Sequence, residues 1–221
     1  LTQLEEINTT EFTDGIFLTH AHFGHYTGLM YLGKEATDAQ NIPVYVMPRM
    51  EDFLSSNGPW GQLVKRKNII LQKMSPNKSV PISDSISVTP IIVPHRDEYT
   101  ETVGYRIKGP QKSALFIPDI DKWERWDQDI INEIEQVDYA FLDATFFSGK
   151  EINNRDISHI PHPFVIESLE KFKELSLSEK NKIVFIHFNH TNPLLDEESQ
   201  ESEYVIRQGY NIGRIHDKFK L

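Results

Sequence analysis

The chain has 221 residues and a formal net charge of −10, from 23 Lys and Arg against 33 Asp and Glu. This length allows one large domain or two small ones, with a core that needs no cross-links. The negative charge repels phosphate backbones and so disfavours non-specific nucleic-acid binding. The chain has no cysteine, which excludes disulfides and thiolate ligands, so a transition metal would need imidazole and carboxylate ligands.

No apolar run reaches the roughly 20 residues that a membrane-spanning helix needs. Residues 1–11 have neither the basic region nor the apolar core of a signal peptide. We therefore expect a soluble protein, cytoplasmic or periplasmic, with a small-molecule substrate and neither a membrane nor a nucleic-acid partner. The sequence does not indicate an oligomeric state.

Apolar runs rich in β-branched and aromatic residues predict a series of strands. These runs are 15–19, 43–47, 86–93, 103–107, 114–117, 139–142 and 183–186. The turn signal Lys108-Gly109-Pro110-Gln111 lies between two of them and predicts a hairpin. The last two runs are apolar throughout, which is typical of strands that helices cover in α/β proteins.

Helical periodicity appears between the strands. The predicted helices cover residues 26–36, 50–54, 126–136, 163–175 and 198–209. A further segment, Asn57-Gly58-Pro59-Trp60, reads as a turn. Strands and helices alternate without a linker or a repeat, so we expect one continuous α/β domain over residues 1–221.

Three histidines stand together after the first predicted strand. His20 and His22 are two residues apart, which directs both rings to one side of an extended strand end. His25 follows in the turn into the next helix and can return to the same point. Imidazole is the commonest transition-metal ligand, so this cluster predicts a metal site. A histidine-rich surface turn is the alternative.

The segment Leu18 to Leu29, with His20-Ala21-His22-Phe23-Gly24-His25, resembles the HxHxDH signature of the metallo-β-lactamase superfamily. Further segments resemble motifs of its tRNase Z-like branch in the same order. They are Pro94-His95 with residues 102–107, Phe116-Ile117-Pro118-Asp119, residues 141–146 and Ile215-His216-Asp217.

This resemblance implies a fold and a set of ligands. The implied fold is the α/β, four-layer αββα sandwich of the superfamily. Only one strand precedes the histidine cluster, so we expect the chain to lack the N-terminal strands of that fold. The implied first metal site is His20, His22, His95 and Asp119. The implied second site is His25, Asp119 and His216, with Asp119 as the bridge.

Gly24 stands where the signature has aspartate, so the second site has one carboxylate fewer. The second site is therefore weak or empty, or its character changes. The resemblance implies zinc, as one or two ions, with iron or manganese as alternatives. Two histidines and one carboxylate with open positions also suit non-haem Fe(II).

Residues 185–195, which contain His187, resemble the H-x-N-x-T-N-P stretch of the coenzyme PQQ synthesis protein B family. Residues 25–29 and 143–145 also have counterparts in that family. Its members lack the two leading histidines at 20 and 22, and they carry cysteines that are absent here. The resemblance therefore implies a side branch of this family.

His187 and Asp143 each follow a buried strand. They could form a pair that protonates a leaving group, or a structural hydrogen bond. His159 and His162 precede a predicted helix; they could contact substrate or only form the helix entry. His190 could line a pocket or cap the turn at residues 191–193.

These features predict a metal-dependent hydrolase of ester, amide or phosphoester bonds that uses a metal-activated water. Asp119 would position the ion and the nucleophile, and His187 with Asp143 would assist the leaving group. Two alternatives remain: an iron oxygenase acting on an amino-acid-derived substrate, and a metal-binding module without catalysis.

Overall fold

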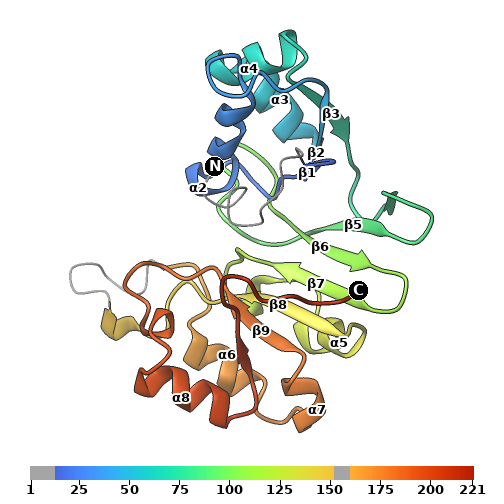
Figure 1. The fold of residues 1–221 in the computed structure, drawn as a ribbon. Helices are drawn as coiled ribbons and strands as arrows, with labels where there is room; N and C mark the ends of the chain where they lie inside the picture. Colours follow the sequence, from blue (N-terminus) through green and yellow to red (C-terminus); the bar gives the residue numbers. More distant parts are fainter. Residues whose placement is uncertain (1–12, 152–159) are drawn as a thin grey trace. The chain divides into compact units, whose positions relative to one another are not determined.

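The computed structural model describes residues 13–151 and 160–221. The chain forms two compact units, residues 1–78 with 97–103 and residues 79–96 with 104–221. Each unit has its own sheet, and both sheets are drawn in Figure 1. The fold is mixed α/β, as the sequence predicts. The expectation of a single domain over residues 1–221 stays a prediction.

The first unit is built on three parallel strands in the order β1-β2-β3. They are β1 (Ile16–Phe17), β2 (Ile42–Val46) and β3 (Ile69–Lys73). The helices of this unit are α2 (Phe23–Tyr26), the 3-10 helix η1 (Thr27–Leu32), α3 (Pro48–Ser56) and α4 (Gly58–Lys65). Helices α3 and α4 place Leu54 and Leu63 in the same apolar core as Val44 of the sheet. Helical crossovers are what parallel strands require, since a tight turn cannot join them.

The second unit is built on seven strands in the order β10-β9-β8-β7-β6-β5-β4. In chain order they are β4 (Val80–Pro81), β5 (Ser87–Ile92), β6 (Val103–Lys108), β7 (Ser113–Ile117), β8 (Tyr139–Asp143), β9 (Ile183–Ile186) and β10 (Asn211–Ile212). Strands β7 to β10 run parallel to one another. Strands β6 and β7 pair antiparallel from Lys108 opposite Ser113, which confirms the predicted hairpin.

Helices pack on the sheet of the second unit, and several can be followed in Figure 1. They are η2 (Trp123–Arg125), α5 (Ile130–Glu135), η3 (Gly149–Glu151), α6 (Val165–Lys171), α7 (Leu177–Lys180), η5 (Pro193–Leu195) and α8 (Gln200–Arg207). The core joins Leu115 and Phe185 of the strands to Ile134, Phe172 and Val205. None of the helices in the described ranges is long and apolar enough to cross a membrane.

Two predicted helices and one predicted turn differ from the structure. The helix expected over residues 26–36 is the short α2 followed by η1, which ends before Gly33. The segment 57–60, expected as a turn, opens α4, because Pro59 is tolerated in a first turn where its missing N–H is not needed. The helix expected from residue 126 begins at Ile130, where the side chain of Asp129 caps it by accepting from the N–H of Ile131 at 2.8 Å.

Candidate metal centre

Three chemically active side chains follow neighbouring parallel strands of the second unit. Asp119 follows β7 after Pro118, Asp143 is the last residue of β8, and His187 follows β9. The register pairs Ile117 with Leu142 and Asp143 with Ile186. Because parallel strands end at the same edge of a sheet, this register brings the three side chains to one edge. Ligand-binding residues commonly occupy that edge in open α/β sheets.

Asp143 is fully buried, and its carboxylate accepts from four donors. Oδ1 accepts from the N–H of Thr145 at 2.8 Å and from its hydroxyl at 2.7 Å. Oδ2 accepts from the N–H of Ile120 at 3.1 Å and from Nδ1 of His162 at 2.9 Å. Burial by itself raises the pKa of Asp143, but the charge and hydrogen bond of His162 outweigh it and hold the pKa below its usual value. Asp143 is therefore an ionised carboxylate that organises this edge.

His162 lies between two carboxylates. Its Nδ1 atom is 2.9 Å from Asp143 and 3.1 Å from Oδ1 of Asp119. Burial lowers the pKa of His162, but the charges and hydrogen bonds of Asp143 and Asp119 outweigh burial and raise it to about 10. In the metal-free protein the ring is thus an imidazolium at neutral pH. The sequence left open whether His162 is only a helix-entry residue, and the structure places it in the site.

His95 is a second histidine in contact with Asp119, and it makes this contact through Nε2. His95 Nε2 is 3.2 Å from Oδ1 of Asp119, and His95 Nδ1 is 3.1 Å from Oδ1 of Asp121. Asp121 in turn accepts from Arg125 at 2.8 Å. A carboxylate on Nδ1 fixes the orientation of the ring and leaves Nε2 for a metal ion, as in many metal sites. Asp121 was not predicted as a site residue; its signal was its position two residues after Asp119.

His187 contacts Asp143 through Thr145. The hydroxyl of Thr145 donates to Asp143, so it accepts from Nδ1 of His187, 2.9 Å away. The direct separation of His187 Nδ1 and Asp143 Oδ1 is 3.7 Å, so the expected Asp143–His187 pair is an indirect one. Burial lowers the pKa of His187, but the hydrogen bond and charge of Asp143 outweigh it and raise the pKa. Thr145 therefore fixes the orientation of the His187 ring.

The backbone of His187 is in the left-handed region, with φ 63°. This conformation is uncommon outside glycine and costs of order 1 kcal/mol or more, and such residues cluster at functional sites. His187 follows directly after β9, and its ring lies at the strand-end edge. Ligand atoms of His187 and Asp119 lie within 4.8 Å of each other.

The side chains at this edge fit a divalent cation. Asp119, Asp143 and His162 each offer a ligand atom, and the three atoms lie within 4.8 Å of one another. All are nitrogen or oxygen donors, the types that zinc, iron and manganese accept when no thiolate is present. Asp119 and Asp143 are also buried, which lowers the competition from water at these two carboxylates. The second unit therefore contains a donor set suited to a metal.

The first unit gathers the three histidines of the opening motif. The ring centroid of His20 is 4.5 Å from that of His22 and 4.2 Å from that of His25. His20 is buried, with Nδ1 3.1 Å from the hydroxyl of Thr19 and Nε2 2.9 Å from Nδ1 of His22. His22 Nε2 also lies 3.4 Å from Glu98. The predicted convergence of these three rings is thus present within the unit.

His216 occupies a different kind of position. It lies on an exposed turn with φ 73°, and it joins none of the metal-competent groups found among the described residues. At the edge near Asp119 the structure places His187 and His162 instead. His190 is exposed after the loop that follows β9. His159 lies outside the described residues.

The chain resembles proteins of one biosynthetic family along most of its length. It is 26% identical over 223 residues to the coenzyme PQQ synthesis protein B of Cupriavidus necator, covering 89% of this chain and 70% of that protein. It is 23% identical over 227 residues to the protein of the same name from Nitrosococcus oceani, covering 90% and 71%. The crystal structure of Zn(2+)-bound PqqB from Methylobacterium extorquens superposes with a TM-score of 0.72 at 22% identity, covering 90% of this chain and 70% of that one.

The fold of that neighbour agrees with the α/β fold of metallo-β-lactamase type that the histidine motif implied. The family model described as Beta-lactamase superfamily domain matches residues 3–188 of the chain. That range contains all three histidines of the opening motif, both strand-end aspartates and His187. The chain belongs to the beta-lactamase superfamily.

Proposed function

We propose that the chain is a metal-dependent hydrolase whose cation binds at the strand-end edge of the second unit. The observation that carries the proposal is the convergence of two histidines on Asp119: His95 Nε2 lies 3.2 Å from it, and ligand atoms of His187 and Asp119 lie within 4.8 Å of each other. A bound zinc ion lowers the pKa of water from 15.7 toward about 7 and so supplies hydroxide at neutral pH. Ester, amide and phosphoester bonds are the proposed substrates.

The residues of the edge have separate roles in this proposal. Asp119 and His95 are ligands, and Asp121 orients His95 through Nδ1. His187, with its Nδ1 proton held by Thr145, presents Nε2 as a further ligand in the place expected for His216. His162 holds a proton on Nδ1 between the two aspartates and is the group that assists the leaving group, a role expected for His187 with Asp143.

His20, His22 and His25 are proposed as further ligands from their sequence pattern. Their rings converge within the first unit, which supports a shared role. Gly24 has open space around the position of a Cβ atom, so a larger residue would fit there sterically. Steric crowding therefore does not require glycine at this position. Because the second site lacks this carboxylate, we expect the chain to bind one metal ion.

The test combines metal content with turnover. Protein purified without added metal, and then loaded with zinc or manganese, is assayed on ester, phosphodiester and lactam substrates. We expect about one equivalent of metal in the wild-type chain and a loss of both metal and turnover in His95→Ala. The proposal fails if the metal is bound stoichiometrically and no substrate of the panel turns over.

A second candidate is an iron-dependent oxygenase in coenzyme PQQ synthesis. The likeness to coenzyme PQQ synthesis protein B over 89% of the chain favours it. His95 and His187 each have a ligand atom near Asp119, and two histidines with one carboxylate are the set that non-haem Fe(II) oxygenases use. Stoichiometric Fe(II) with oxygen consumption on an amino-acid-derived substrate would support this candidate. Hydrolysis by the zinc-loaded and manganese-loaded protein without oxygen consumption would exclude it.

A further inference from the structure

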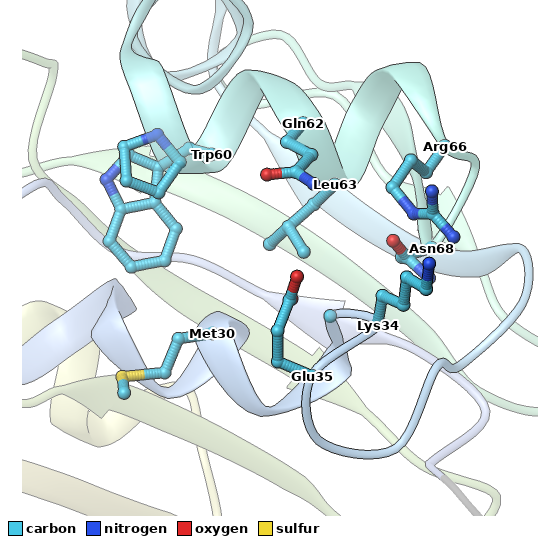
Figure 2. A pocket seen from close by; sticks show the side chains of 10 residues that line it. Met30, Lys34, Glu35, Trp60, Gln62, Leu63, Arg66 and Asn68 are labelled. Carbon is cyan, nitrogen blue, oxygen red and sulfur yellow. The ribbon is translucent and has the colours of Figure 1, made fainter.

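The first unit contains a pocket that the metal chemistry does not use. It has a volume of about 130 Å³ and lies between α4 and the segment that ends η1. Figure 2 shows Trp60 and Met30 at one end of it and Arg66, Asn68 and Lys34 at the other. The pocket therefore has an apolar end and a polar end.

Asn68 contributes a buried acceptor that the rest of the unit does not use. Its side chain is fully buried, and within the described part of the chain Oδ1 has no hydrogen-bond partner. The amide cannot be turned around, because Nδ2 donates to the backbone oxygen of Ala39 at 2.8 Å and to Asp38 at 3.2 Å. A buried acceptor without a donor is destabilising, so this position favours a ligand that brings an N–H group.

Two opposite charges line the same pocket. Lys34 and Glu35 are adjacent in the chain, and within the described ranges neither forms an ion pair. Figure 2 shows the Glu35 carboxylate directed toward α4, and Lys34 at the same end of the pocket as Asn68. Arg66 adds a second cation, and its contact with Asp38 is a weak one at 3.7 Å between two exposed side chains. The polar end thus offers one anion and two cations.

The apolar end has a defined shape. Trp60 is held by an edge contact with Tyr26, with ring centroids 5.0 Å apart, and Leu63 is buried beside it in the pocket wall. Met30, which is more than half exposed, lines the same end of the pocket across from Trp60. Flexible thioether and aromatic walls suit a small aliphatic or thioether group.

We propose that this pocket binds a free α-amino acid with a small apolar side chain. The ammonium group lies between Glu35 and Oδ1 of Asn68, and the carboxylate lies toward Lys34 and Arg66. The side chain lies toward Trp60. A ligand with only one charge would leave either Glu35 or the two cations without a partner.

The first experiment compares three ligands on the full chain, after chelation so that no metal competes for the amino acid. Isothermal titration calorimetry is run with L-leucine, with 3-methylbutylamine, which lacks the carboxylate, and with 4-methylpentanoate, which lacks the ammonium. We expect saturable binding of leucine and binding weaker by about fivefold or more for each analogue, because each loses one set of charge contacts. Equal affinities, or no leucine binding up to its solubility limit, would overturn the proposal and leave water as the partner of Asn68.

The second experiment locates the site with surface variants that should not affect folding. Glu35→Gln and Lys34→Gln are each expected to weaken leucine binding by about two- to fivefold, while Lys65→Gln on α4, outside the pocket, leaves it unchanged. A change of tryptophan fluorescence on leucine binding should disappear in Trp60→Phe. Leucine binding that is the same in the pocket variants as in Lys65→Gln would place the amino acid elsewhere and refute the assignment.

Discussion

The Nδ1 atom of His162 lies 2.9 Å from Oδ2 of Asp143, and this contact joins the segment before α6 to the end of β8. The same atom is 3.1 Å from Asp119 at the end of β7. One imidazolium thus lies between two buried carboxylates and reduces the repulsion between them. Four measurable consequences follow for the strand-end edge.

Replacing His162 should destabilise the metal-free protein in a pH-dependent manner. We expect His162→Gln to lower the free energy of unfolding by about 3–5 kcal/mol, because it leaves two buried carboxylates without a cation. The folded-state pKa of His162 is raised from 6.5 to about 10. Its stabilisation is therefore complete below about pH 6.5 and is lost as the pH rises through about 10.

The difference in the free energy of unfolding between wild type and His162→Gln is measured by urea unfolding. The measurement is made in the presence of a chelator, at several pH values across this range. The exposed His190 provides the matched control, since His190→Gln should leave the free energy of unfolding almost unchanged. A difference between wild type and His162→Gln that stays constant with pH would contradict the role of the imidazolium.

Zinc should stabilise the wild-type chain but not a variant of Asp119. Ligand binding to the folded state adds about 2.7 kcal/mol when the free ligand is at 100 times its dissociation constant. Asp119→Asn keeps the shape of the side chain but removes the anionic ligand, so the zinc-dependent rise in melting temperature should disappear. Asp127→Asn, at an exposed position, is the control. An equal rise in both variants would remove Asp119 from the metal site.

Asp121 should act on the metal through His95. Its Oδ1 atom accepts from Nδ1 of His95, so Asp121→Asn should weaken zinc binding by about 10–100-fold without abolishing it. Competition against a chromophoric chelator measures the affinity. Arg125→Gln alone, which keeps Asp121 but removes its ion pair, should produce a smaller loss of zinc affinity. Unchanged affinity in Asp121→Asn would mean that His95 needs no orienting carboxylate.

The two histidines at positive φ should differ in function. Asparagine tolerates the left-handed backbone, so His187→Asn and His216→Asn should both fold with nearly wild-type stability. His187→Asn should lose zinc affinity by about 100-fold or more. This loss is greater than the roughly 10–100-fold expected when a residue that only orients a metal ligand is removed. His216→Asn should retain it, because that side chain lies on an exposed turn. The reverse result would restore His216 as the ligand.

Much of the fold can be predicted from the sequence because its signals are local. The apolar runs at β7, β8 and β9 and the turn between β6 and β7 were all recognisable, and parallel strands predict that Asp119 and Asp143 meet at one edge. Helix ends were less predictable. Helix α5 starts at Ile130 because the side chain of Asp129 caps it, a contact that periodicity alone does not show.

The sequence by itself determined the opening histidine motif, the strand-end aspartates and the absence of thiolate ligands, since these depend only on residue type and on neighbours in the chain. Only the tertiary structure decided which distant histidines join the aspartates. His162 and His187 reach Asp143 because the register of β8 and β9 and the loop before α6 bring them there, whereas His216 ends on an exposed turn. Which histidines lie near the aspartates depends on packing between segments that are far apart in sequence. Local sequence patterns do not predict that packing.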